Sequence, residues 1–139
     1  MEKIYTTDSK VIHLSSNRDI NQKLGDIIGK KFVDYRKKWD LVHEKFLETD
    51  FPLFLQIHPN QSCNYSCPHC LLGNDSVKKE YKEKSLSSQL FMRIVDEGYE
   101  HKCPSISIQG WNEPLYMKKI FDYIDYANKK DFIDIMLNS

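Results

Sequence analysis

Apolar residues recur along the chain with two different spacings, and the change of spacing predicts a mixed α/β fold. Between residues 29 and 49 the spacing is three or four positions, typical of one face of an amphipathic helix: Phe32, Tyr35, Trp39, Val42, Phe46 and Leu47. Pro52 disfavours helical geometry in the residue before it, so this helix should end at Phe51. A weak alternation from Lys3 to Leu14 favours a small hairpin around Asp8-Ser9-Lys10.

The second half of the chain alternates between short strands and helices. Short apolar or alternating runs predict three strands, at Leu53–Ile57, Ser105–Gln109 and Phe132–Leu137. Ser87 is a suitable N-cap for a helix that ends near Gly98, and residues 115–129 predict a second helix. The order strand, helix, strand, helix, strand implies right-handed crossovers and a parallel sheet.

These patterns divide the chain into two parts. Residues 1–50 form an N-terminal extension with a weak hairpin and an amphipathic helix, and residues 51–139 carry the α/β pattern. The 20 basic and 20 acidic residues cancel, so no global charge argues for nucleic acid or an anionic membrane as a partner. No apolar stretch approaches the roughly 20 residues that span a bilayer, and no secretory signal follows Met1. The expected compartment is therefore the cytoplasm.

Three of the four cysteines lie close together in the loop after the first predicted strand: Cys63, Cys67 and Cys70. Thiols are reduced in the cytoplasm, where so tight a group indicates metal binding before a disulfide framework. An iron–sulfur cube normally takes four cysteine ligands. Three ligands leave one iron with an open coordination position, where chemistry can occur. The fourth cysteine, Cys103, is more typical of an apolar core residue than of a ligand.

A second motif follows the second predicted strand, as Gln109-Gly110-Trp111-Asn112-Glu113-Pro114. The two motifs in this order resemble the radical S-adenosylmethionine (SAM) enzyme superfamily. The resemblance implies that Cys63, Cys67 and Cys70 hold a [4Fe–4S] cluster and that SAM chelates its fourth iron. Reductive cleavage of SAM would then give a 5′-deoxyadenosyl radical, which abstracts hydrogen from a substrate. The hard chemistry belongs to the cofactor, and the protein orients it and excludes water and oxygen.

The resemblance also implies roles for single residues near the cofactor. His69 stands before the last cysteine, where the family usually has an aromatic residue that lies against adenine. The family's Gly-Gly-Glu-Pro turn receives the SAM amino group, and its positions map onto Trp111, Asn112, Glu113 and Pro114, with Gly110 just before.

Both glycines of that turn are replaced in this sequence. Glycine lets backbone approach a ligand closely, so Trp111 either reshapes the pocket or points away from it. Asn112 is the milder change, because asparagine tolerates left-handed backbone geometry. Asn138 follows the third strand and resembles the start of a polar stretch that implies a further SAM contact. No catalytic residue is identified from the sequence.

The predicted topology brings these motifs to one place. Ligands of parallel α/β sheets collect at the carboxyl ends of the strands. The cysteine loop follows the first strand, the Glu-Pro turn follows the second and Asn138 follows the third. The three segments should therefore converge on one edge of the sheet.

The resemblance covers residues 50–139 and implies an incomplete parallel βα barrel. These would be the first three strands of a TIM-like (βα)6 partial barrel with an N-terminal helical extension. The chain is shorter than such a barrel needs, so we expect a truncated enzyme, a disrupted gene product or one piece of a split enzyme, inactive alone.

The helix that ends at Phe51-Pro52 resembles that of members with a C-terminal cysteine-rich SPASM domain, which act on peptides or are carbohydrate-associated. The substrate is unknown within those classes. The resemblance implies a reduced flavodoxin or ferredoxin as electron donor.

The alternative is a small non-enzymatic zinc or iron–sulfur binding module. Three cysteines and His69 match a structural Cys3His zinc set, but such sites more often draw a second ligand pair from a separate segment. His101 and Cys103 are the candidates for that pair, and they precede the second strand. That position is at the opposite end of the strand from the cysteine loop.

Overall fold

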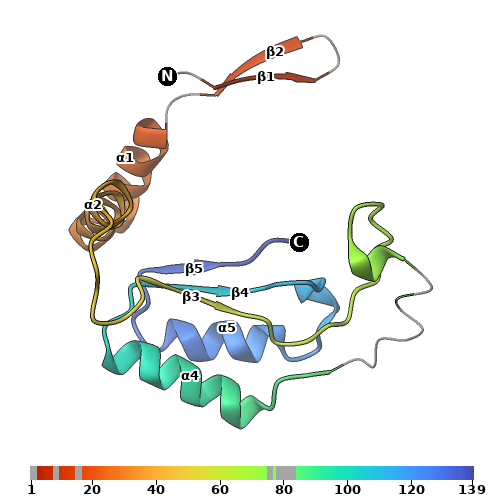
Figure 1. Ribbon diagram of the computed structural model, residues 1–139. Helices are drawn as coiled ribbons and strands as arrows, with labels where there is room; N and C mark the ends of the chain where they lie inside the picture. Colours follow the sequence, from red (N-terminus) through yellow and green to blue (C-terminus); the bar gives the residue numbers. More distant parts are fainter. Residues whose placement is uncertain (1–2, 8–9, 15–16, 75–76, 78–83) are drawn as a thin grey trace. The chain divides into compact units, whose positions relative to one another are not determined.

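The structure, a computed structural model, describes residues 3–7, 10–14, 17–74, 77 and 84–139 (Figure 1). The chain divides into two compact units, Met1–Glu48 and Thr49–Ser139, which are described separately. Within the described residues, no helix combines the length and the apolar character needed to cross a membrane.

The first unit contains a hairpin and two helices. Strands β1 (Lys3–Thr7) and β2 (Lys10–Leu14) pair antiparallel, while Asp8 and Ser9 of the predicted turn lie outside the described residues. Helix α1 (Asn17–Ile28) was not expected from the sequence, and α2 (Lys30–Lys45) follows it after one residue. That residue is Gly29, whose φ of 101° lies in the region that favours glycine.

Helix α2 is shorter than the apolar pattern predicts. Phe32 and Tyr35 are buried as expected, whereas Phe46 and Leu47 are exposed. The helix ends at Lys45 because Phe46 adopts a left-handed conformation with φ 51°, which stops the helical backbone one turn before residue 49.

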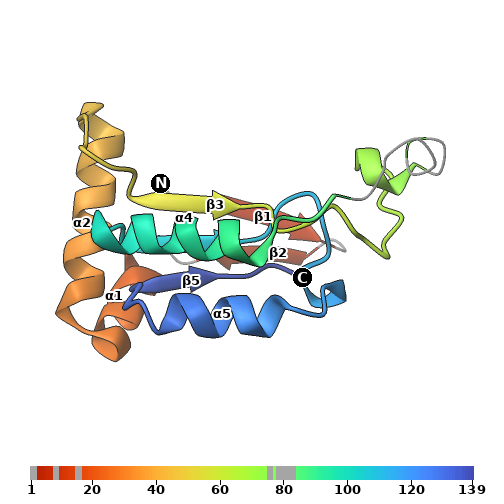
Figure 2. The same ribbon diagram turned by 90° about the horizontal axis from the view of Figure 1, so that it is seen from below.

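The second unit is built on a parallel sheet in the order β3-β4-β5. Its strands are β3 (Phe54–Ile57), β4 (Ser105–Ile108) and β5 (Asp134–Met136), each within a predicted strand. Helices α4 (Ser88–Glu100) and α5 (Ile120–Asn128) both lie on one face of this sheet, as Figures 1 and 2 show. The predicted α/β fold class with a parallel sheet is confirmed.

Side chains from both helices and the central strand form the core of this unit. Ile106 and Ile108 of β4 are fully buried against α4 and α5. The rings of Phe91 in α4 and Tyr123 in α5 stack with their centroids 3.9 Å apart. Cys103 joins the same cluster at 5% exposure, which confirms the expectation that it is a core residue.

The two helices begin differently from one another. Ser87 caps α4 as predicted, because its side-chain oxygen accepts the backbone N–H of Leu90 at 3.2 Å. The helix predicted from residue 115 is interrupted, since a 3-10 turn, η2 (Pro114–Tyr116), comes first and α5 starts only at Ile120. The Glu113 side chain accepts the backbone N–H of Leu115 at 3.1 Å and caps this turn.

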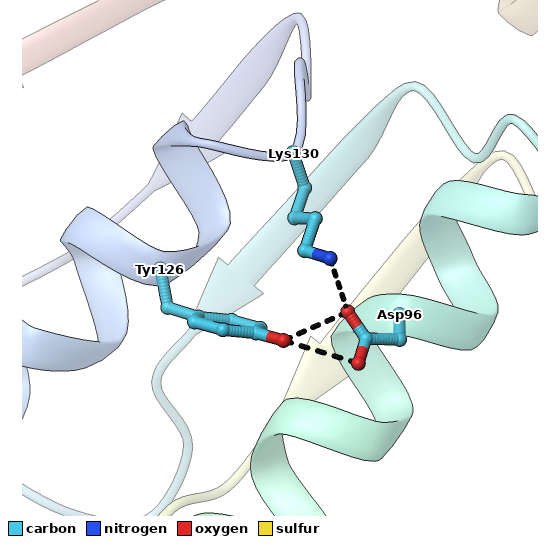
Figure 3. Close-up of polar contacts among 3 residues, drawn as sticks. All are labelled: Asp96, Tyr126 and Lys130. Atoms are coloured by element: carbon cyan, nitrogen blue, oxygen red, sulfur yellow. Dashed lines mark hydrogen bonds and ion pairs between the residues drawn. The ribbon is translucent and has the colours of Figure 1, made fainter.

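A polar cluster joins α4 to α5 and to the residues just after α5 (Figure 3). Tyr126 donates its hydroxyl proton to the Asp96 carboxylate, with oxygen–oxygen distances of 2.9 and 3.0 Å. The ammonium of Lys130 lies 2.7 Å from Oδ1 of Asp96. These hydrogen bonds, from Lys130 first and Tyr126 second, lower the pKa of Asp96, and the bond to Asp96 raises the pKa of Lys130.

Candidate functional site

The carboxyl ends of the three strands lie at one edge of the sheet. In the parallel register Ile57 is opposite Ile108, and Ser107 is opposite Met136. The arrowheads of β3, β4 and β5 point the same way in Figure 1, toward the cysteine loop and the C-terminus. The structure therefore brings the segments after β3, β4 and β5 to the same edge, where ligands of α/β folds bind.

Hydrogen bonds join the segment after β3 to the turn after β4. The side-chain amide of Asn112 donates to Oδ1 of Asn60 at 3.0 Å, and Asn60 is only 6% exposed. The backbone N–H of Glu113 donates to the carbonyl oxygen of Ser62 at 3.1 Å. The start of the cysteine loop and the Glu-Pro turn are thus in direct contact.

Gly110 is in close contact with the neighbouring ring of His58. A Cβ at Gly110 would lie 2.2 to 2.4 Å from ring atoms of His58, which is closer than any real Cβ contact. The ring of His58 therefore packs against bare backbone. The sequence suggested no role for this histidine, and the structure gives it this packing role.

Glu113 is the buried carboxylate of the site, with 6% exposure. Its Oε1 accepts two hydrogen bonds, from the backbone N–H of Leu115 at 3.1 Å and from the hydroxyl of Ser139 at 2.6 Å. Among the described residues nothing donates to Oε2. A second link to the segment after β5 runs from the backbone N–H of Asn138 to the side-chain oxygen of Gln109.

The cysteine loop folds back on itself beyond Tyr65. The backbone N–H of Cys70 donates to the carbonyl of Cys67 at 3.1 Å, and that of Gly73 donates to the carbonyl of Cys70 at 2.9 Å. The loop closes in a 3-10 turn, η1 (Leu71–Gly73). A Cβ at Gly73 would lie 2.0 Å from the carbonyl oxygen of Cys67, so this compact turn requires glycine.

The three thiols of the loop are free, with Cys67 exposed and Cys63 and Cys70 half-buried. Three accessible thiols on one tight loop fit the chemistry of an iron–sulfur or zinc centre. In the part of the chain that the structure describes, no three or more His, Cys, Asp or Glu side chains are grouped so as to hold a metal ion. Metal binding would therefore require the three thiols to come closer together than they lie in this structure.

The remaining predicted site residues lie at the same edge but are open to solvent. His69 is exposed within the cysteine loop, Trp111 is 58% exposed in the turn, and Asn138 is exposed after β5. Among the described residues, no hydrogen bond joins these three side chains to one another or to the thiols. More than half of the surface of Trp111 is thus open to solvent.

The contacts of several site residues were not predicted from the sequence. Asn60 and Ser62 join the turn to the cysteine loop, and Gln109 and Ser139 join the ends of β4 and β5. The signal that could have revealed them is their position, because each is a polar residue within a few positions of the end of a parallel strand.

Comparison of the chain with protein-family models, with curated proteins and with solved structures gave no match.

Proposed function

We propose that this chain is part of a radical SAM enzyme, in which Cys63, Cys67 and Cys70 bind a [4Fe–4S] cluster and the Glu113 turn binds SAM. The observation that supports this most is the direct hydrogen bonding between the segment that opens the cysteine loop and the turn that carries Glu113. A three-thiol loop and a buried carboxylate share the edge of a parallel sheet at which cofactors bind.

The chemistry of the cofactor and the contribution of the chain are distinct. When bound, the cluster and SAM supply reductive cleavage to a 5′-deoxyadenosyl radical and hydrogen abstraction from a substrate. The residues of the chain would bind the cofactors and orient them. Glu113 is suited to receive the ammonium of SAM, because Oε1 is fixed by Leu115 and Ser139 while Oε2 has no donor among the described residues. Hydrogen bonds between an ionised carboxylate and an ammonium are stronger than those between neutral groups.

The exposed residues at the same edge have the roles that the resemblance implies. His69 supplies the ring that lies against adenine, and Asn138 supplies a polar contact. The backbone of Gly110, Trp111 and Asn112 lines the approach to the amino group of SAM.

The position of the fourth cysteine favours an open cluster site over a closed one. Cys103 precedes β4, so it lies at the opposite end of the strand from the segment that contacts the cysteine loop. Its thiol donates to the carbonyl of Ser105 at 3.4 Å, and burial raises the pKa of this thiol. A thiol at the far end of the sheet is too remote to complete a four-cysteine set with the loop.

The same proposal extends to the fold, the partners and the substrate. We take β3, β4 and β5 as the first three strands of a (βα)6 partial barrel, because β3 and β5 each have a single neighbour among the described strands. Unpaired strand edges are avoided in natural proteins, so further strands would be expected at such an edge. We further propose that the enzyme belongs to a SPASM-containing subgroup and acts on a peptide or a carbohydrate-related substrate. Its electron donor would be a reduced flavodoxin or ferredoxin.

Iron counting after anaerobic reconstitution tests the cluster assignment. With iron and sulfide, wild type and Cys103→Ser should each bind about four iron atoms per chain, because this substitution lies outside the cysteine loop. Cys63→Ser, Cys67→Ser and Cys70→Ser should each lose most of that iron. Loss of metal in Cys103→Ser, or tight zinc and no iron in wild type, would instead favour the small metal-binding module.

A further inference from the structure

Asn60 stands where three segments of the second unit meet. Its backbone forms an antiparallel bridge with Ser85, just before α4. The residues on either side of Asn60 extend this contact through two backbone hydrogen bonds, from Gln61 to Lys84 and from Leu86 to Pro59. Its side chain, 6% exposed, accepts the amide of Asn112. The backbone around Asn60 is thus held by the residues before α4, independently of the bond from its side chain to the turn after β4.

Asn112 uses both ends of its side chain in the same junction. Its Oδ1 accepts the backbone N–H of Gly110 at 2.8 Å, and its Nδ2 donates to Asn60 at 3.0 Å. A neutral amide can accept a hydrogen bond through its oxygen and donate one through its nitrogen at the same time. A glycine at this position would supply neither bond.

We propose that Asn60 and Asn112 are a positioning pair that fixes the Glu113 turn against the start of the cysteine loop. The next residue, Glu113, donates its backbone N–H to the carbonyl of Ser62. The side-chain pair and this backbone bond therefore join the same two segments at adjacent positions of the turn. The pair therefore sets the separation between the Glu113 carboxylate and Cys63. Its effect on SAM binding rests on the proposed function, whereas the coupling of the two segments does not.

Aspartate substitutions test the pair with almost no change of shape. In Asn60→Asp an oxygen still accepts from Asn112. In Asn112→Asp an oxygen still accepts from Gly110, and the amide of Asn60 can turn to donate to the new carboxylate. The double variant sets two carboxylates against each other without a donor between them, so the pair is broken only when both changes are present.

Amide hydrogen exchange of the whole 139-residue chain without metal gives the first readout. We expect exchange at Glu113 in the double variant to be at least about tenfold faster than in wild type, and both single variants to stay close to wild type. Amides in the middle of α4 should keep their rates and report that the fold is intact. Wild-type protection of Glu113 in the double variant would overturn the proposal.

A further pair of variants covers the case in which the double variant does not fold. Asn112→Ala removes both side-chain bonds without introducing charge, and Asn112→Asp keeps them. The alanine variant should then show the faster exchange at Glu113 and the aspartate variant should not. Equal rates in the two variants would overturn the proposal.

SAM binding to the cluster-loaded protein gives the second readout. The Kd for SAM should rise by about tenfold or more in the double variant, while its iron content stays at the wild-type value. An unchanged Kd in the double variant would show that the pair does not position the cofactor. Failure of the wild type to bind iron would refute the proposed function instead, and the exchange experiment would still decide whether the segments are coupled.

Discussion

At residue 110, the absence of a side chain leaves room for the ring of His58. The space for a Cβ at Gly110 is already occupied by the imidazole of His58. His58 is itself exposed, so its ring has solvent to move into when a methyl group is added. The clash is therefore with a side chain that can be removed by a second substitution.

We expect Gly110→Ala to lower the free energy of unfolding by about 1–3 kcal/mol, because the ring of His58 must leave its place. His58→Ala combined with Gly110→Ala should recover most of this loss. Urea unfolding of the two single variants and the double variant measures the coupling. Equal stability of Gly110→Ala and wild type would mean that the ring does not pack on this glycine.

Glu113→Gln tests the charge of the buried carboxylate separately from its capping role. Glutamine keeps a side-chain oxygen for Leu115 and Ser139, so the thermal unfolding temperature should change little. The charge that would receive the SAM ammonium is lost, and the Kd for SAM should rise by about tenfold or more. Titration of cluster-loaded protein with SAM measures this, and an unchanged Kd would remove Glu113 from the proposed site.

At the scale of elements, the sequence predicted strands and caps better than helix ends. The three strands and the cap at Ser87 followed from alternation and from one hydroxyl before an apolar run. The end of α2 did not, because the apolar spacing continues past Lys45 while the backbone at Phe46 turns left-handed. The start of α5 was missed because Glu113 caps a 3-10 turn whose residues also fit a helical pattern.

Ser87→Ala should lower the free energy of unfolding by about 1 kcal/mol, because the backbone N–H of Leu90 loses its acceptor at the start of α4. Ser87→Asp keeps an acceptor and adds a negative charge near the helix N-terminus, so it should be at least as stable as wild type. Thermal or urea unfolding distinguishes the two. Similar destabilisation in both variants would contradict the capping role.

The cluster of Asp96, Tyr126 and Lys130 should make the contact of α4 with α5 dependent on pH. The folded pKa of Asp96 lies below its ordinary value of 3.8, so its contribution is complete above that value and is lost as the pH falls through the folded pKa. The folded pKa of Lys130 lies above 10.5, so its contribution is complete below that value and is lost as the pH rises through the folded pKa.

Asp96→Asn should therefore lower Tm at pH 7 by a small amount, since the pair is exposed, and the difference should shrink in acid. Glu97→Gln removes a neighbouring charge of the same helix without touching this cluster and serves as the control. Thermal unfolding of both variants between pH 7 and pH 2 measures the effect. A difference between Asp96→Asn and wild type that is unchanged in acid would exclude Asp96 as its source.

At the scale of the whole molecule, each described contact of the candidate site comes from the unit Thr49–Ser139. The sequence predicted that the three segments after the strands would meet, because parallel strands bring their carboxyl ends to one edge. It could not predict the bonds of Asn60 with Asn112 or of Glu113 with Ser139. Such pairs depend on the distance and angle between two loops. The spacing of residues within a single segment carries no information about that geometry.

The most direct test of the central claim is electron paramagnetic resonance of the anaerobically reconstituted and reduced protein, with and without SAM. The proposed function predicts a reduced [4Fe–4S] signal whose shape changes when SAM is added, because three cysteine ligands leave one iron open to it. A cluster signal indifferent to SAM, or no iron–sulfur signal with zinc bound instead, would contradict the assignment of this chain to radical SAM chemistry.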